Sequence, residues 1–343
     1  MHACSIVNPD PGEENVLEQT RQAQLENVSR LGAVPILNQS VEISNRLVDA
    51  SNQLQQELNL NNLEQVRQIW KELGLTLARY EIYDHEANRV TFGLTRFPVD
   101  PEFIEERIAD SSPTADEISS RPTLFTPFNT IEYLIFGDDA MILDKLASNP
   151  RRLVYLNQLV AYTDSIVQEF LKKWSDEQAD YESALEIGVY GSQNKIANSM
   201  IKSIEFARRF RLGVALGDFQ GGEPDPELLE AFRSEFSLEF LKANFEEFKL
   251  AFFGNYPDAV QEIGFHDYLL AVDQAEVADE FTQVLSNIDA QLLDMDILKD
   301  ELIQNPDKVR ALRDEYETLS RLLKLDLPNA TGVVVIFFVC DKD

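Results

Sequence analysis

The sequence predicts an all-α protein built from two antiparallel helical-bundle domains, with a short extended segment at its C-terminal end. Three observations predict this class. Only 14 glycines and 14 prolines occur among 343 residues, so the two residues that interrupt helices are scarce. Apolar residues recur every three or four positions over long stretches, which is the period of an amphipathic helix. The length suggests two domains, since one domain usually takes about 150 residues.

The composition also excludes several classes of function. Asp and Glu number 60 and Lys and Arg 30, for a formal net charge of −30. Such a surface repels the phosphates of nucleic acids and anionic lipids, so we expect no nucleic-acid partner. The longest apolar run, residues 332–340, is too short to span a bilayer. We therefore expect membrane contact only through a lipid anchor.

The first half is predicted to be a flexible leader followed by a bundle. Residues 1–15 are mostly polar and predict the leader. Residues 16–180 form the predicted N-terminal bundle, with long helices over about 16–83 and 153–174. Between these helices, residues 97–127 hold five prolines and a Ser/Thr/Asp cluster, which predicts an irregular insertion. Irregular segments of this length are uncommon inside domains and are often functional.

A short buried helix is predicted to follow the insertion. Thr126 is a suitable cap for it, and Pro127 suits its first turn. Gly137 can end it in the left-handed conformation. The body of the helix is mostly apolar, so it must be largely buried. Asn129 and Glu132 are three residues apart and therefore share one face of this helix.

Residues 181–343 are predicted to form the C-terminal bundle, with the domain boundary between about 175 and 190. Asp225 followed by Pro226 is expected to open a helix with an aromatic face. The segment 333–339 is β-branched and aromatic, which favours a strand or extended segment packed against the bundle.

Four segments are informative together. They read PFNTIEYLIFG at residues 127–137, NSMIKSIEFARRFRLGVALG at 198–217, SEFS to FFG at 234–254, and TGVVVIFFVCD at 331–341. In this order they resemble the imelysin family, also called the M75 peptidase-like family, whose signature G-x-H-x-x-E aligns with the first. The others resemble the Leu-Gly-x-x-Leu-Gly loop of its second domain, a following helix, and a final hydrophobic segment that leads to Asp.

The resemblance implies a fold of two helical bundles with a site between them near the signature. It also implies an exported protein of the bacterial cell envelope, linked either to M75-type peptidase activity or to iron uptake. The signature is altered in this chain. Asn129 stands at its His and Pro127 at its Gly, so Glu132 alone remains of the polar pair.

The residues offer little for hydrolytic chemistry. A zinc hydrolase needs about three protein ligands and an open position for water. The three histidines, His2, His85 and His266, form no H-E-x-x-H motif, and we expect His85 to be solvated and His266 to be structural. An Asn side chain is a poor ligand for Zn²⁺. No G-x-S-x-G elbow or phosphate-binding loop is present either. The sequence therefore favours no catalytic residue, and a metal ion is conceivable only at Glu132.

Two interpretations of Glu132 stay open. As a structural group it would pair with Arg208, Arg209 or Arg211, because an unpaired buried charge is costly. As part of a ligand-binding site it would act with Asn129, Arg208 and Arg209 at the interface between the domains.

The favoured function is a non-catalytic imelysin-like protein of the cell envelope, a binding component associated with iron or metal uptake. Its partners would be iron or another metal ion, a small ligand, or envelope proteins. The alternatives are an M75-type metallopeptidase and a structural or partner-binding helical module. Residues 1–4, MHAC, resemble the end of a bacterial lipoprotein signal, so Cys4 is a candidate lipid anchor. The expected location is the periplasm, or the outer membrane as a lipoprotein facing the periplasm or the exterior.

Overall fold

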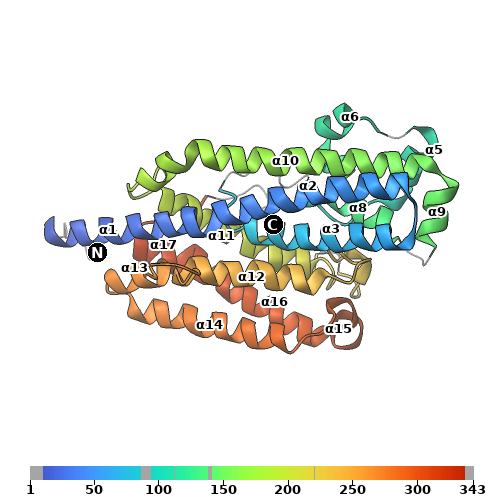
Figure 1. The fold of residues 1–343 in the computed structure, drawn as a ribbon. Helices are drawn as coiled ribbons and strands as arrows, with labels where there is room; N and C mark the ends of the chain where they lie inside the picture. The colour runs from blue at the N-terminus through green and yellow to red at the C-terminus, as the bar shows by residue number, and fades with distance from the viewer. Residues whose placement is uncertain (1–10, 86–93, 112, 138–140, 220, 337–343) are drawn as a thin grey trace.

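The structure, a computed structural model, describes residues 11–85, 94–111, 113–137, 141–219 and 221–336. Within these ranges the regular elements are all helices, which confirms the predicted all-α class. The long helices run roughly side by side, with those of the first half above those of the second half in Figure 1. None of the described helices is long and apolar enough to cross a membrane.

The first half is built on three long helices. α1 (Pro11–Asn27) continues through a π-helical stretch, η1 (Val28–Ala33), into α2 (Val34–Gln56). α2 packs against both α3 (Leu60–Tyr80) and α10 (Pro150–Ser183). Long apolar stripes on each helix face the neighbouring helices, as the sequence pattern predicts.

The predicted flexible leader, residues 1–15, is wrong in its last part. α1 begins at Pro11, and a proline is tolerated in the first turn of a helix because the N–H that it lacks has no partner there. The remaining residues of the predicted leader, including Cys4, lie outside the described residues.

The prediction that residues 97–127 are mostly irregular is also wrong. Pro101 and Pro122 lie in the first turns of helices rather than in loops, where their fixed φ suits the helix. Thr114 and Glu117 form a capping box that begins another helix. The three short helices in this segment are α5 (Pro101–Asp110), α6 (Ala115–Ser120) and α7 (Pro122–Phe125).

α8 (Pro127–Phe136) is the short apolar helix predicted after this segment, and Pro127 lies in its first turn as predicted. Thr126, however, makes no capping hydrogen bond. It has a left-handed backbone, with φ 41° and ψ 62°, because it also ends α7. Gly137 follows α8 with φ 61°, which favours glycine, although its ψ of −167° is not that of a left-handed helix. α9 (Ile142–Ser148) then leads into α10.

The second half of the chain begins after α10, at α11. The helix predicted from Asp225 is wrong: only a 3-10 turn (η3) follows, and the next long helix, α12, begins at Ser237. Between them, Ala231 and Glu235 have positive φ values of 52° and 57°, which interrupt the helix. The elements of this half are α11 (Ser192–Phe206), η2 (Ala207–Gly213), η3 (Pro226–Leu228), α12 (Ser237–Phe253), α13 (Phe265–Ala271), α14 (Ala275–Leu293), α15 (Leu298–Gln304), α16 (Pro306–Arg321), η4 (Leu322–Asp326) and α17 (Leu327–Thr331).

The halves meet along α3 and α12, where aromatic rings interlock. The Trp70 ring on α3 stacks on Phe128 of α8 at 4.7 Å between centroids, and lies 5.8 Å from Phe240 of α12. Gly74 makes room for this contact, because a Cβ there would lie 2.1 Å from the Phe240 ring. Buried apolar residues form one core that includes both halves. The division into two domains at about residue 180 stays a prediction.

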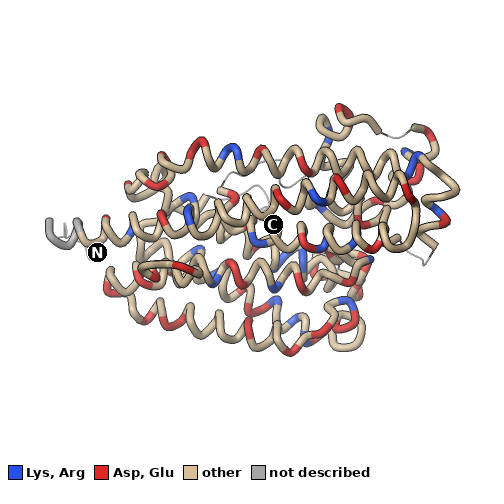
Figure 2. Tube along the Cα trace, in the orientation of Figure 1, with Lys and Arg blue, Asp and Glu red and all other residues tan. Residues whose placement is uncertain are grey.

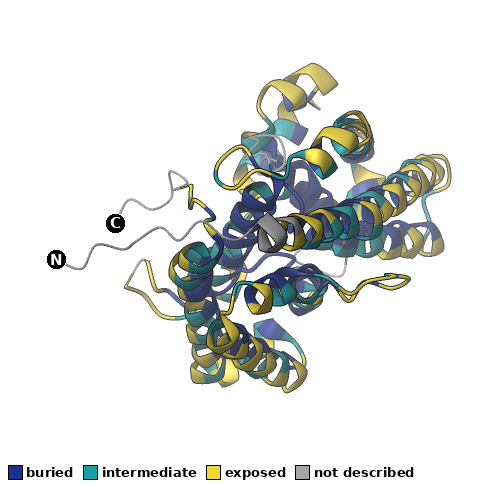
Figure 3. Cartoon of the chain, turned by 90° about the vertical axis from the view of Figure 1, so that its left-hand side faces the viewer, coloured by how far each residue is buried: buried dark blue, intermediate teal, exposed yellow. Residues whose placement is uncertain are grey.

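The surface follows the composition. Asp and Glu are spread along the helices of both halves rather than gathered in one place (Figure 2). Exposed residues lie on the outward faces of the helices and buried residues lie between them (Figure 3). At the C-terminal end, α16 runs through η4 into α17, which ends at Gly332 with φ 74°. Residues 333–336 are not helical, in agreement with the extended segment predicted over 333–339; the rest of that segment lies outside the described residues.

Candidate functional site

α8 buries the polar side chains of Asn129 and Glu132, and Glu132 contacts the second half of the chain. Asn129 is 2% exposed and Glu132 is 3% exposed. The helix is held in place by the indole N–H of Trp70, which donates to the carbonyl oxygen of Phe128 at 3.0 Å. The structure therefore confirms that α8 is buried and that Asn129 and Glu132 are interior groups.

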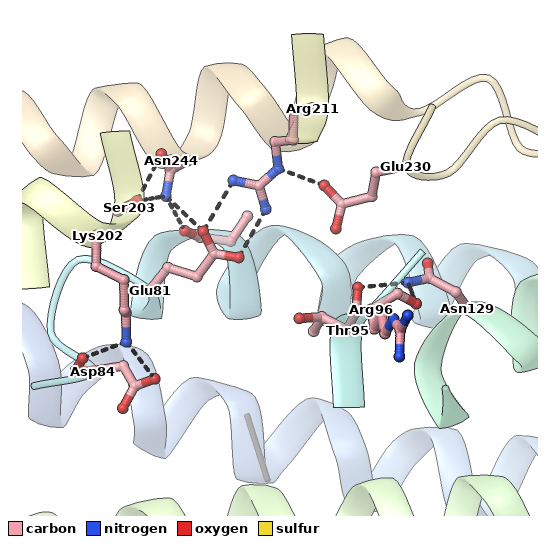
Figure 4. A network of polar contacts seen from close by, with 11 residues as sticks. Glu81, Asp84, Thr95, Arg96, Asn129, Lys202, Ser203, Arg211, Glu230 and Asn244 are labelled. Carbon is pink, nitrogen blue, oxygen red and sulfur yellow. Dashed lines mark hydrogen bonds and ion pairs between the residues drawn. The ribbon is translucent and has the colours of Figure 1, made fainter. Parts of the chain in front are cut away.

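The Asn129 amide has one satisfied end and one unsatisfied end. Its Nδ2 donates to the carbonyl oxygens of Thr95 and Arg96, at 2.8 and 2.9 Å (Figure 4). These two bonds fix the orientation of the amide, so its oxygen must point the other way. Oδ1 is buried and has no hydrogen-bond partner. A buried acceptor without a donor is costly, so Asn129 offers an acceptor to a group that can donate to it.

Glu132 is bound to the second half of the chain by a backbone group. The N–H of Ser234 donates to Glu132 Oε1 at 2.7 Å. Burial raises the pKa of Glu132 to about 7, although the hydrogen bond from Ser234 and the charge of Arg233 lower it, and Glu230 raises it further. Near neutral pH this carboxyl group can therefore be present as an acid or as a carboxylate.

The turn that carries Ser234 is unusual in its backbone. Ala231 and Glu235 flank Ser234 and both have positive φ. Such conformations cost free energy in residues with a Cβ and are kept where surrounding contacts enforce them. Here the turn brings the Ser234 N–H to Glu132 and places Glu230 beside Arg211.

Arg211 is the buried cation of this interface. It forms ion pairs with Glu230 at 2.5 Å and with Glu81 of the first half at 2.8 Å (Figure 4). Its guanidinium also lies 5.1 Å from the centre of the Phe206 ring. Burial opposes the charge of Arg211, but the two carboxylates raise its pKa well above the ordinary value. Burial raises the pKa of Glu230, while Arg211 lowers it.

A second polar group joins the halves beside this cluster. Asn244 Nδ2 donates to the carbonyl oxygen of Ala78 at 2.8 Å and to Ser203 Oγ at 2.8 Å. Lys202 pairs with Asp84 at 2.9 Å across the same interface (Figure 4). This part of the interface is therefore a polar network, beside the aromatic contact of Trp70, Phe128 and Phe240.

The predicted pairing of Glu132 with arginines is corrected by the structure. Arg208 pairs with Glu205 at 2.9 Å and with Glu317 at 3.6 Å, and Arg209 lies over the ring of Phe219. Arg208 and Arg209 precede Arg211 on one π-helical stretch, η2, and the helix geometry gives each side chain a different direction. Arg211 does enter the interface, but with Glu81 and Glu230 as its partners.

Sequence reasoning missed Ser234, Glu230 and Glu81 as site residues. The only signal was the resemblance of residues 234–254 to a family segment, which marked the region without assigning a contact. A backbone N–H donor such as that of Ser234 leaves no trace in a sequence, because every residue except proline has one.

The described residues do not fit a transition-metal centre. Among the described residues no group of three or more His, Cys, Asp or Glu side chains is arranged to hold a metal ion. His85 was predicted to be solvated, but it packs at 5.2 Å from the Trp174 ring and its side chain is 12% exposed. Burial lowers the pKa of His85. His266 packs on the Phe253 ring, as expected of a structural residue. At α8 the donors are a neutral amide oxygen and one carboxyl group, a poor set for a borderline-soft ion.

Comparison with known proteins agrees with this architecture. The model of the Imelysin (Peptidase M75) family matches residues 33–325. An imelysin-like protein from Psychrobacter arcticum 273-4 is 17% identical with a TM-score of 0.69, and the match covers 97% of this chain and 100% of that one. A protein from Parabacteroides distasonis ATCC 8503, proposed to be an iron-regulated protein A precursor, is 14% identical with a TM-score of 0.74, covering 95% and 97%. No curated protein matches the chain.

Proposed function

The chain belongs to the imelysin family, and we propose that it is a non-catalytic binding component of the bacterial cell envelope, associated with iron or metal uptake. The proposal that the protein is not catalytic rests on the Asn129 side chain. In the family signature a His stands at this place, whereas here a neutral amide is fixed by two backbone carbonyls. A hydrolytic centre at α8 would lack the nitrogen ligand that holds zinc.

The binding site of this proposal is the interface beside Glu132. Asn129 supplies a buried acceptor without a partner, and Glu132 is a buried acid with a pKa of about 7. Together they suit a small polar ligand that donates hydrogen bonds, rather than a transition-metal ion held by these two groups. The association with iron uptake is supported by the family and by a structural neighbour proposed to be iron-regulated.

The association with iron uptake is tested in the bacterium that encodes the chain. Cells lacking the gene are grown under iron limitation, and uptake of ⁵⁵Fe is compared with that of cells complemented by the wild-type gene. We expect at least a two-fold loss of uptake, restored by the wild type and not by an Asn129→Leu/Glu132→Leu variant. Uptake that does not depend on the gene contradicts the proposal.

Asn129→His is the sharpest variant for the chemistry of α8. We expect the wild-type protein to bind no stoichiometric Zn²⁺ in calorimetric titration with zinc chloride, and to cleave no denatured casein with or without a chelator. Asn129→His should raise the affinity for Zn²⁺, because imidazole is a much stronger ligand than an amide. Asn129→Leu is the control, since it adds no ligand.

The proposal of a non-catalytic protein would be overturned by stoichiometric zinc and chelator-sensitive proteolysis in the wild-type protein, if both are lost in Glu132→Ala. The chain would then be the M75-type metallopeptidase.

The envelope location is part of the proposal, with Cys4 as a lipid anchor. One acyl chain gives only marginal membrane binding, so stable anchoring needs the several chains of a bacterial lipoprotein. The test is labelling of the full precursor with a palmitate analogue in a bacterial host. Label that is absent from the wild type, or that persists in Cys4→Ala, removes the anchor from the proposal.

A further inference from the structure

Two asparagines on α11 hold the backbone of the C-terminal segment. Asn194 Oδ1 accepts from the N–H of Val334 at 2.6 Å, and Asn198 Oδ1 accepts from the N–H of Ile336 at 2.7 Å. Asn198 Nδ2 donates to the carbonyl oxygen of Val334 at 2.9 Å. Both asparagines are nearly fully buried, at 2% and 4% exposure.

The spacing of these bonds follows from helix and strand geometry. Asn194 and Asn198 are one turn apart on α11, which is about 6 Å along the axis. In an extended chain, every second residue points its N–H to the same side, and two residues span about 6.6 Å. Because these two spacings are nearly equal, asparagines one helical turn apart can each accept from the N–H of every second residue of the segment. The N–H of Val335 points to the opposite side of an extended chain.

One group of this arrangement is left without a partner. Asn194 Nδ2 is buried and has no hydrogen bond, whereas the equivalent Nδ2 of Asn198 is satisfied. An unpaired buried donor is costly. The resident segment therefore leaves part of the binding capacity of the asparagines unused.

The segment is held through its backbone and through alternate side chains. Val333 is buried, at 7% exposure, and Val335 packs against the core, while Val334 and Ile336 are 45% and 48% exposed. A site that binds backbone groups gives affinity without reading most side chains. It requires an extended chain with apolar residues at the positions of Val333 and Val335, and tolerates variety at the two exposed positions.

We propose that Asn194 and Asn198 form a binding site on α11 for an extended apolar peptide, and that residues 333–336 of the chain are its resident occupant. When this segment leaves, an extended apolar peptide from a partner takes the same backbone bonds. The site lies on α11, whereas Asn129 and Glu132 lie on α8, and it does not depend on the function proposed above.

The test uses the full-length chain with its own segment displaced. Val333→Asp places a charge at the buried anchor and should release the segment, leaving the asparagines unchanged. The probe is a fluorescent peptide with the sequence of residues 331–336 and two added lysines for solubility. We expect Val333→Asp to bind it at least ten-fold more tightly than the wild type, because a tethered segment competes at high effective concentration.

Backbone methylation of the probe distinguishes binding at this site from non-specific hydrophobic binding. Methylating the nitrogen of Val334 or Ile336 removes a donor to Asn194 or Asn198, and should weaken binding about ten-fold. Methylating Val335 should change it less than three-fold. Asn198→Leu in the Val333→Asp background should also weaken binding about ten-fold.

Circular dichroism checks that each variant is folded, and Val333→Gly replaces Val333→Asp if the charge prevents folding. Absence of peptide binding to both released variants overturns the proposal. So does equal weakening by methylation at Val334 and at Val335, or binding that survives Asn198→Leu.

Discussion

Glu132 shows how one buried carboxyl group can link the halves of the chain and respond to pH. Its hydrogen bond from the Ser234 N–H favours the carboxylate, but burial favours the acid and dominates. The acid form at neutral pH limits the cost of placing a carboxyl group among apolar residues. Arg211 solves the same problem differently, by taking two carboxylate partners.

The pKa of Glu132 predicts a pH dependence of stability. In the folded protein the group keeps its proton up to about pH 7, whereas in the unfolded chain it loses it near the ordinary value of 4.5. Between these values the folded state binds more protons, so the free energy of unfolding falls as the pH rises. The contribution is about 3 kcal/mol, present below pH 4.5 and lost above pH 7.

Glu132→Gln should remove this contribution, because the amide does not titrate and its oxygen can still accept from Ser234. Urea unfolding at pH 5 and pH 8 should show a smaller loss of stability for Glu132→Gln than for the wild type. Glu169→Gln, at an exposed position of α10, should behave as the wild type. An identical loss in Glu132→Gln and wild type means that Glu132 does not carry the effect.

At the scale of the element, the short helices α5, α6 and α7 show how prolines and capping residues can begin helices in a segment that the sequence pattern predicts to be irregular. Each begins at a local signal: Asp100 before Pro101, the capping box of Thr114 and Glu117, and Pro122. None is long enough to be stable alone, so packing against the long helices must complete them. The buried Ile104 and Ile118 supply that packing.

Thr114→Ala tests the capping box at the start of α6. Its hydroxyl accepts from the N–H of Glu117, and the Glu117 side chain accepts from the N–H of Thr114. Loss of the hydroxyl should lower the free energy of unfolding by about 1 kcal/mol, measured by chemical denaturation. Ser119→Ala, in the same helix but away from its cap, should change stability by less than half of that. Equal effects would contradict the capping role.

At the scale of the whole molecule, α3 and α12 hold the halves together by a close approach at Gly74. The two rings nearest to Gly74, those of Phe240 and Phe128, are both almost fully buried, and a Cβ at Gly74 would lie 2.1 and 3.1 Å from them. Because the core includes both halves, a substitution at this contact should lower the stability of the entire chain rather than of one half.

Gly74→Ala should therefore lower the stability of both halves together, by about 1–3 kcal/mol as for other overpacked cores. Thermal unfolding followed by tryptophan fluorescence and by circular dichroism should give one coincident transition at a lower Tm. Gly222→Ala is the control, because a Cβ at Gly222 meets no atom within 4 Å. Two separated transitions would show that the halves unfold independently.

Local patterns in the sequence determined the helical class and the burial of α8, because helix periodicity depends on residues only a few positions apart. The tertiary structure alone decided the partners of the buried polar groups. Ser234 lies 102 residues from Glu132, and Glu81 lies 130 residues from Arg211. Which helix faces meet is settled by the packing of the whole core, and a buried charge takes the partner that this packing brings within reach.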